Sequence, residues 1–177
     1  MVGSQRGHGG RFGVKSLFLI VLDLCRFRGG PQYFPASGFL ASCLFFLDLA
    51  ISGLAASLHQ EVAMAIAEAF VSSVLLGSFI ILLLWMTKHQ DRVMSSLCAV
   101  YGSDAMVTLV AIPLLIMGMN GSATQDSPLI LLIVIWSLAI FARILKIALG
   151  VGWALSIALA VVFNLLSMEI LALVFSP

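Results

Sequence analysis

Five long apolar runs, each about as long as a bilayer is thick, constrain the fold of this chain more than any other feature. The clearest extends from Phe70 to Met86, where only a glycine and a few serines interrupt the large apolar side chains. Of the 177 residues, 62% are hydrophobic and 10% are charged, and the mean hydropathy is +1.15. A water-soluble domain cannot bury so much apolar surface, so the surrounding solvent must be lipid. The sequence therefore predicts an all-α integral membrane protein with five transmembrane helices.

Capping and turn residues separate the five runs. Ser37 is a good N-cap for the first span, and Ser127-Pro128 is a helix start in which proline takes the first helical position. Residues 59–61 form the whole connection between the first two spans, which must therefore be an antiparallel hairpin. Gly150 and Gly152 indicate the last tight turn. The predicted spans are 39–58, 62–86, 97–119, 128–149 and 153–175.

The chain divides into three parts. Residues 1–11 predict a flexible basic tail, residues 12–36 a helix followed by a Pro/Gly turn, and residues 37–177 the transmembrane bundle. The helix is too short and too charged to span, and its broad apolar face suits an amphipathic helix at the membrane interface. Its basic side chains would contact anionic lipid headgroups: Lys15, Arg26 and Arg28. Because the apolar stripe is wide, a re-entrant segment is the alternative.

Basic residues predict the orientation of the chain. All nine Lys and Arg residues fall on one side of the predicted bundle: five precede the first span, two lie between the second and third, and Arg143 and Lys146 lie near the end of the fourth. The opposite connections, residues 59–61 and 120–127, contain none. The positive-inside rule therefore places the N-terminus in the cytoplasm and, after five spans, the C-terminus outside. A bacterial protein of this kind would lie in the inner membrane.

Ionisable groups within a span are costly and are candidates for function. From the predicted ends of the third and fourth spans, Asp104 and Arg143 both lie about 10 Å from the cytoplasmic edge. An ion pair between them is expected. Its simplest role is structural, because such a pair fixes the register of two helices while Arg143 extends toward the headgroups.

A second layer of polar residues lies farther from the cytoplasmic side. Glu68 and Glu169 are each about 9 Å from the outer edge, on the second and fifth spans. If they meet, two like charges would favour a shared proton, as a proton or cation site requires. The alternative is that each bonds separately to a nearby polar group. Asp48 and Asn164 lie near mid-membrane, where an interhelical hydrogen bond is their simplest role.

Small residues spaced four apart predict close helix packing, either within the bundle or in a homo-oligomer. The pairs are Gly53 and Ser57, Ser73 and Gly77, and Ala154 and Ala158.

The sequence contains no recognisable catalytic, metal or cofactor motif. Motifs of serine hydrolases, zinc proteases and phosphate-binding loops are absent, so an enzyme is not expected. The three histidines lie in separate predicted loops, and no cysteine belongs to a C-x-x-C pair, so we expect no metal site. The net charge of +1 gives no indication of a nucleic acid partner.

The order of these features resembles the Yip family of five-span membrane proteins and its bacterial relatives. Two stretches carry the likeness: Tyr101-Gly102-Ser103 through Ala111-Ile112-Pro113 in the third span, and Ile135-Trp136-Ser137-Leu138 with Trp153-Ala154-Leu155-Ser156-Ile157-Ala158 in the fourth and fifth. The resemblance covers roughly residues 30 to 175. It implies a cytosolic N-terminus and protein partners in the membrane. Eukaryotic members bind Rab GTPases through a longer N-terminal region, so a Rab partner is not expected here.

The sequence leaves two functions open. The first is a non-enzymatic membrane scaffold or adaptor of Yip-like type, which organises an unidentified membrane protein partner or the bilayer itself. The alternative is a small ion or proton channel or transporter that uses the intramembrane carboxylates Asp48, Glu68 and Glu169. A dry, apolar bundle interior would favour the first function, whereas a polar cavity would favour the second.

Overall fold

The computed structural model describes residues 21–25, 37–88, 90–119 and 128–175, and within these ranges the chain is entirely helical apart from short connections. Five long helices are apolar enough to cross a membrane, so the protein is an integral multi-pass membrane protein. They are α2 (Gly38–Ala56), α3 (Val62–Met86), α4 (Val93–Met119), α5 (Pro128–Leu149) and α6 (Trp153–Phe175). The predicted all-α fold with five spans is thereby confirmed.

The start of one helix, α4, differs from its predicted position. The short 3-10 helix η2 (Gln90–Arg92) leads directly into α4, which therefore begins at Val93 instead of residue 97. The other helices match their predicted spans closely. The Ser37 hydroxyl caps α2 by accepting a hydrogen bond from the backbone N–H of Leu40, at 3.4 Å. Gly150 adopts a left-handed φ of 68° in the turn between α5 and α6, a conformation that favours glycine.

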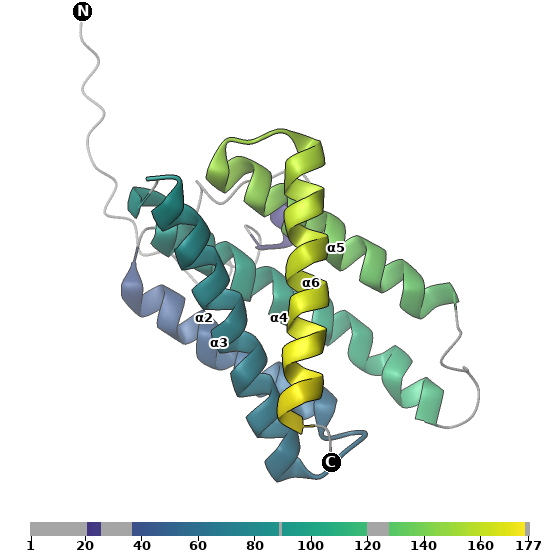
Figure 1. The fold of residues 1–177 in the computed structure, drawn as a ribbon. Helices are drawn as coiled ribbons and strands as arrows, with labels where there is room; N and C mark the ends of the chain where they lie inside the picture. The colour runs from purple at the N-terminus through teal and green to yellow at the C-terminus, as the bar shows by residue number, and fades with distance from the viewer. Residues whose placement is uncertain (1–20, 26–36, 89, 120–127, 176–177) are drawn as a thin grey trace, which may run out of the picture.

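The bundle has two ends, which we name from the direction of the helices (Figure 1). The near end holds the starts of α2, α4 and α6 and the ends of α3 and α5; the far end holds the opposite termini. At the near end, Arg92 donates a hydrogen bond of 3.4 Å to the carbonyl of Ile147. The ammonium of Lys146 lies 4.4 Å from the ring centre of Trp153, a cation–π contact. The first contact joins the α3–α4 connection to α5, and the second links the two helices that flank the α5–α6 turn.

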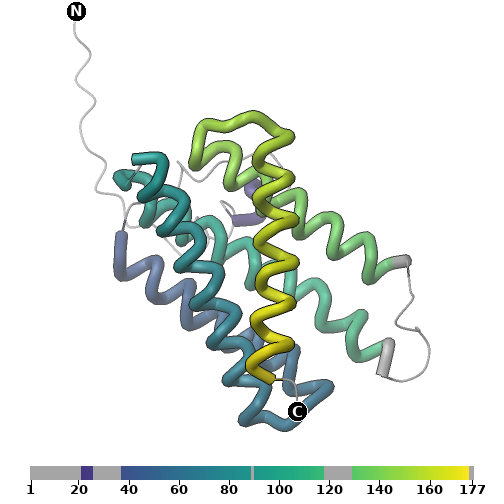
Figure 2. Tube along the Cα trace, in the orientation of Figure 1, coloured from purple at the N-terminus to yellow at the C-terminus, as the bar shows by residue number. Residues whose placement is uncertain are grey.

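The core is concentrated in the near half of the bundle. Side chains with almost no exposed surface come from α3, α4 and α5: Ile80, Leu84, Cys98, Ile144 and Leu145. The far halves of α4 and α5 are largely exposed, and Figure 2 shows their far ends lying apart from the turn between α2 and α3. The bundle is therefore tightly packed at one end and open at the other.

Residues 21–25 form a helical turn that packs into the bundle. Val21 contacts α4 at Gly102, and the indole N–H of Trp136 on α5 donates a 3.3 Å hydrogen bond to the carbonyl of Cys25. Gly102 lies nine residues inside α4, about 14 Å from the near end. The choice between an interfacial helix and a re-entrant segment stays a prediction. The remainder of the predicted interfacial helix, with Lys15, Arg26 and Arg28, lies outside the described residues.

Candidate functional site

Two carboxyl groups meet in the middle of the bundle. Asp48 lies ten residues after the start of α2, and Asp104 lies eleven residues after the start of α4. Both are therefore about 15–17 Å from the near end, which is half of a hydrocarbon core that is about 30 Å thick. The two helices run in the same direction and pack together, so equal depth brings the side chains together. The carboxyl groups lie within hydrogen-bonding reach of each other.

A hydrogen bond between two carboxyl groups requires a proton. An ionised carboxylate only accepts hydrogen bonds, whereas a protonated carboxyl group also donates one. Two adjacent negative charges would in addition repel each other strongly in this poorly solvated position. The geometry of Asp48 and Asp104 therefore fits a pair that shares at least one proton.

A chain of hydrogen bonds from α3 and α4 fixes the position of Asp48. The Ser73 hydroxyl donates to Oδ2 of Asp48 at 3.0 Å, and the Tyr101 hydroxyl donates to the backbone carbonyl of Ser73 at 3.1 Å. Phe45 packs edge-on against the Tyr101 ring, with 5.3 Å between ring centres. At Gly77, a Cβ atom would overlap the Tyr101 hydroxyl oxygen. The glycine thus provides the space that this arrangement needs.

One oxygen of the pair lacks a donor. Asp48 is only 1% exposed, and its Oδ1 atom has no hydrogen-bond donor among the described residues. A buried oxygen without a donor is unfavourable, and such atoms in native structures indicate a bound proton, water or ion. Asp48 therefore has room for one further favourable interaction.

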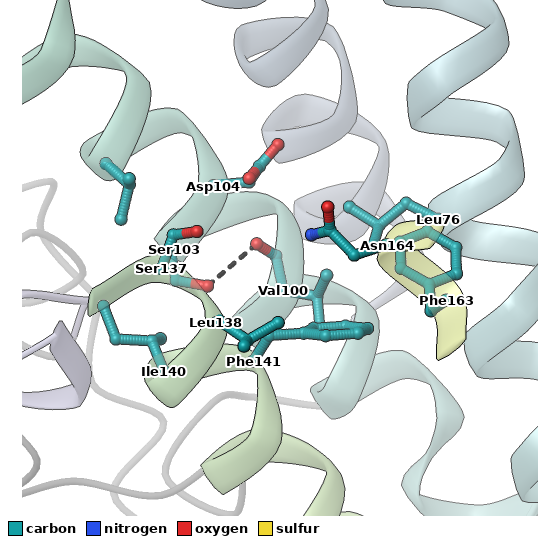
Figure 3. Close-up of a pocket in the computed structure, with 11 residues that line it drawn as sticks. Leu76, Val100, Ser103, Asp104, Ser137, Leu138, Ile140, Phe141, Phe163 and Asn164 are labelled. Atoms are coloured by element: carbon teal, nitrogen blue, oxygen red, sulfur yellow. Dashed lines mark hydrogen bonds between the residues drawn. The ribbon is translucent and has the colours of Figure 1, made fainter. Parts of the chain in front are cut away.

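A polar cavity adjoins Asp104 on the side of α5 and α6. Its volume is about 80 Å³, and Figure 3 shows the carboxyl group of Asp104 directed away from the apolar side chains of Ile140 and Phe141. The Ser103 hydroxyl donates to the carbonyl of Val100 at 3.0 Å, the dashed line in Figure 3. The polar side chains that line the cavity come from three helices: Ser103, Asp104, Ser137 and Asn164. The centre of the bundle is thus not wholly apolar.

Asp104 and Arg143, which the sequence suggests as an ion pair, lie at different distances from the near end. Because α4 begins at Val93, Asp104 lies about 16 Å from the near end, whereas Arg143 lies six residues from the end of α5, at about 9 Å. Arg143 is half-buried, and Asp104 faces Asp48. The ion pair between Asp104 and Arg143 stays a prediction.

The other predicted polar residues fall into two groups. The carboxylate of Glu68 accepts a 2.5 Å hydrogen bond from the side chain of Gln60, and Glu169 is exposed on α6. Among the described residues there is no contact between these two carboxyl groups. Asn164 lies at the same depth as Asp104 and shares the cavity with it. The structure thus joins Asp48, Asp104 and Asn164 into one region and leaves the two glutamates outside it.

Sequence reasoning placed Asp48 and Asp104 in the membrane but did not pair them, and it assigned no role to Tyr101 in the site. The available signal was their equal distance from the starts of two helices that run in the same direction. An error of four residues in the start of the third span concealed that signal. The contributions of Ser73 and Tyr101 depend on which faces of α3 and α4 meet, and hydropathy alone does not specify these faces.

Comparisons of this chain with protein-family models, with curated proteins and with solved structures found no match. The resemblance to the Yip family therefore remains a prediction. Within the described part of the chain there is also no group of three or more His, Cys, Asp or Glu side chains arranged to hold a metal ion. The function must be argued from the geometry of the site.

Proposed function

We propose that this protein is a small proton-coupled channel or transporter in which the carboxyl pair of Asp48 and Asp104 carries the transported proton. The juxtaposition of these two groups at mid-membrane supports the proposal most directly. Acidic side chains at this depth are costly, and in pumps and transporters they mark proton relays. A pair that shares one proton can take up a second one, because the second proton neutralises the remaining negative charge in this poorly solvated position.

The shape of the bundle supports transport as well. The near half is a packed core, whereas the far halves of α4 and α5 have few neighbours, and the carboxyl pair lies at the boundary between the two. A central site between a tightly packed half and a loosely packed half suits a bundle in which one part rocks against the other, as alternating access requires. The described basic residues Lys88, Arg92, Arg143 and Lys146 all lie toward the near end, so we assign that end to the cytoplasm.

Proton flux into proteoliposomes tests this function. The purified protein is reconstituted with an internal pH-sensitive dye, and a potassium diffusion potential drives proton entry. We expect the wild-type protein to acidify the lumen, and Asp48→Asn and Asp104→Asn each to lower the rate at least tenfold. Circular dichroism and size-exclusion chromatography establish that each variant is folded.

Glutamate variants provide the matched control. Glu68→Gln and Glu169→Gln remove membrane carboxylates that lie outside the pair, so we expect wild-type flux from both. Undiminished flux in folded Asp48→Asn and Asp104→Asn proteins would overturn the proposal. Loss of flux only in the two glutamate variants would assign transport to the other carboxylates.

A second candidate function, a membrane adaptor, is favoured by one face of α6. Ala154, Ala158 and Ala172 are all exposed on the face that is turned away from the bundle, and Glu169 borders this face. Small residues allow a second helix to approach closely, so this face suits a membrane protein partner. Photocrosslinking from position 158 tests this function, and we expect an adduct with a membrane protein. The Ala154→Leu substitution should abolish the adduct. Ala63→Leu, a matched change at an exposed alanine of α3, should retain it.

A further inference from the structure

The charge of the carboxyl pair requires compensation. With one shared proton, Asp48 and Asp104 together carry one negative charge in a position that is poorly solvated. A second proton would make the pair neutral, and so would one monovalent cation. An ion with two charges would leave an excess positive charge unless the shared proton also left.

The cavity beside Asp104 offers oxygen atoms for such an ion. Carboxylate, hydroxyl and amide oxygens are ligands for hard cations, and Ser103, Ser137 and Asn164 supply the last two kinds next to Asp104. The hydroxyl groups of both serines donate to backbone carbonyls of their own helices, so their lone pairs are available to the cavity.

The cavity has room for an ion. Its volume of about 80 Å³ exceeds the roughly 10–15 Å³ that a single water molecule needs. A dehydrated alkali cation together with water molecules therefore fits this space. Phe141 and Phe163 form apolar walls of the cavity.

We infer that the cavity lined by Asp104, Ser103, Ser137 and Asn164 binds one alkali metal cation, which exchanges for a proton of the Asp48–Asp104 pair. This inference rests on the proposed function, because the exchanged proton is the transported one. When the cation binds, the O–H bond of one carboxyl group breaks and the proton leaves to water, while the cation forms contacts with the oxygen atoms. Before the exchange the pair holds two protons, and afterwards it holds one proton and the cation. The site is therefore neutral in both states, and both can exist within a bilayer.

The groups around the pair determine how this exchange depends on pH. From α3 the pair meets Ser73, from α4 Tyr101, and from α5 and α6 the cavity residues Ser137 and Asn164. Tyr101 interacts with Asp48, and Arg143 is the charged side chain of α5 that lies nearest in sequence to the cavity residues Ser137 and Ile140. Exchange of one cation for one proton then predicts that the concentration of cation needed for half-saturation rises about tenfold for each unit that the pH falls.

Carbodiimide labelling of the full-length protein in lipid nanodiscs tests the inference. Dicyclohexylcarbodiimide modifies protonated carboxyl groups in apolar surroundings, and mass spectrometry identifies the modified residue. Reactions are run in lithium, sodium, potassium or choline chloride at constant ionic strength. We expect labelling of Asp48 or Asp104 in choline chloride and protection by at least one alkali cation, with the pH dependence given above.

Cavity variants separate cation binding from proton binding. Asn164→Leu and Ser137→Ala should keep the labelling in choline chloride and weaken protection by the alkali cation at least tenfold. Ser78→Ala, which removes an exposed hydroxyl of α3 that is not in this cavity, should behave as the wild type. Equal labelling in all four salts would overturn the cation site and leave the proposed proton function intact. An absence of labelling in every salt would contradict the proposed function itself.

Discussion

The hydroxyl group of Tyr101 on α4 occupies the space that a Cβ atom at Gly77 on α3 would fill. From that position the hydroxyl donates to the carbonyl of Ser73, whose own hydroxyl donates to Asp48. Gly77 and Tyr101 together therefore determine where the carboxyl pair lies. This relationship connects helix packing, which sequence motifs partly predict, with the chemistry of the site.

Substitution Gly77→Ala should destabilise the bundle by about 1–3 kcal/mol, because the added methyl group overlaps the Tyr101 hydroxyl. Thermal unfolding in detergent, followed by circular dichroism, measures the effect. Gly38→Ala is the matched control, since a Cβ at that helical position meets nothing within 4 Å. Equal unfolding temperatures for Gly77→Ala and the wild type would contradict this packing.

Substitution Tyr101→Phe should lower stability by about 1 kcal/mol, the usual scale for an interhelical hydrogen bond in a membrane. It retains the ring that packs against Phe45. The double variant with Gly77→Ala should be more stable than the sum of the single effects predicts, because phenylalanine lacks the oxygen that the new methyl group would overlap. Strict additivity in this double-mutant cycle would show that the two residues do not interact.

The loss of stability on replacing Asp104 should depend on the residue that replaces it. Asp104→Asn retains the fold, because the amide N–H₂ group can donate to Asp48 without a shared proton. Asp104→Leu leaves Asp48 buried without that partner and should cost at least about 1–3 kcal/mol. Unfolding by titration with a denaturing detergent compares the two variants. A leucine variant as stable as the asparagine variant would argue against contact between Asp48 and Asp104.

Cys25 should resist alkylation in the folded protein. Burial raises the pKa of the Cys25 thiol to about 11, so at pH 8 it is almost wholly in its unreactive protonated form. In a variant with Cys43→Ser and Cys98→Ser, N-ethylmaleimide should modify position 25 only slowly at pH 8 and faster as the pH approaches 11. Complete modification in sodium dodecyl sulfate is the positive control. Rapid labelling at pH 8 without denaturant would contradict the packing of residues 21–25 into the bundle.

The sequence was sufficient for the five helices because apolar length, capping residues and turn glycines are local signals. The ends of α3, α5 and α6 were predicted correctly, since residues such as Pro128 and Gly150 limit helices through their own backbone geometry. The start of α4 was placed too late because η2 contains charged residues, which hydropathy assigns to a loop. That error moved the predicted position of Asp104 toward the cytoplasmic edge, to the depth of Arg143.

The composition of the site could be predicted only in part. Acidic and amide side chains are rare within membrane spans, so Asp48, Asp104 and Asn164 could be selected as polar groups of interest from the sequence alone. Their partners depend on the rotation of each helix about its axis, and in a membrane both faces of a helix are apolar. The hydrogen bond from Tyr101 to Ser73 and the space at Gly77 are visible only once α3 and α4 are packed together.

Infrared spectroscopy of the protein in lipid nanodiscs tests the shared proton most directly. We predict that the wild-type protein at neutral pH shows the C=O stretching band of a protonated carboxyl group. The band should move on transfer to heavy water and should change in both Asp48→Asn and Asp104→Asn, while Glu68→Gln and Glu169→Gln leave it unaltered. A wild-type spectrum without such a band at neutral pH would show that both aspartates are ionised, and would contradict the shared proton.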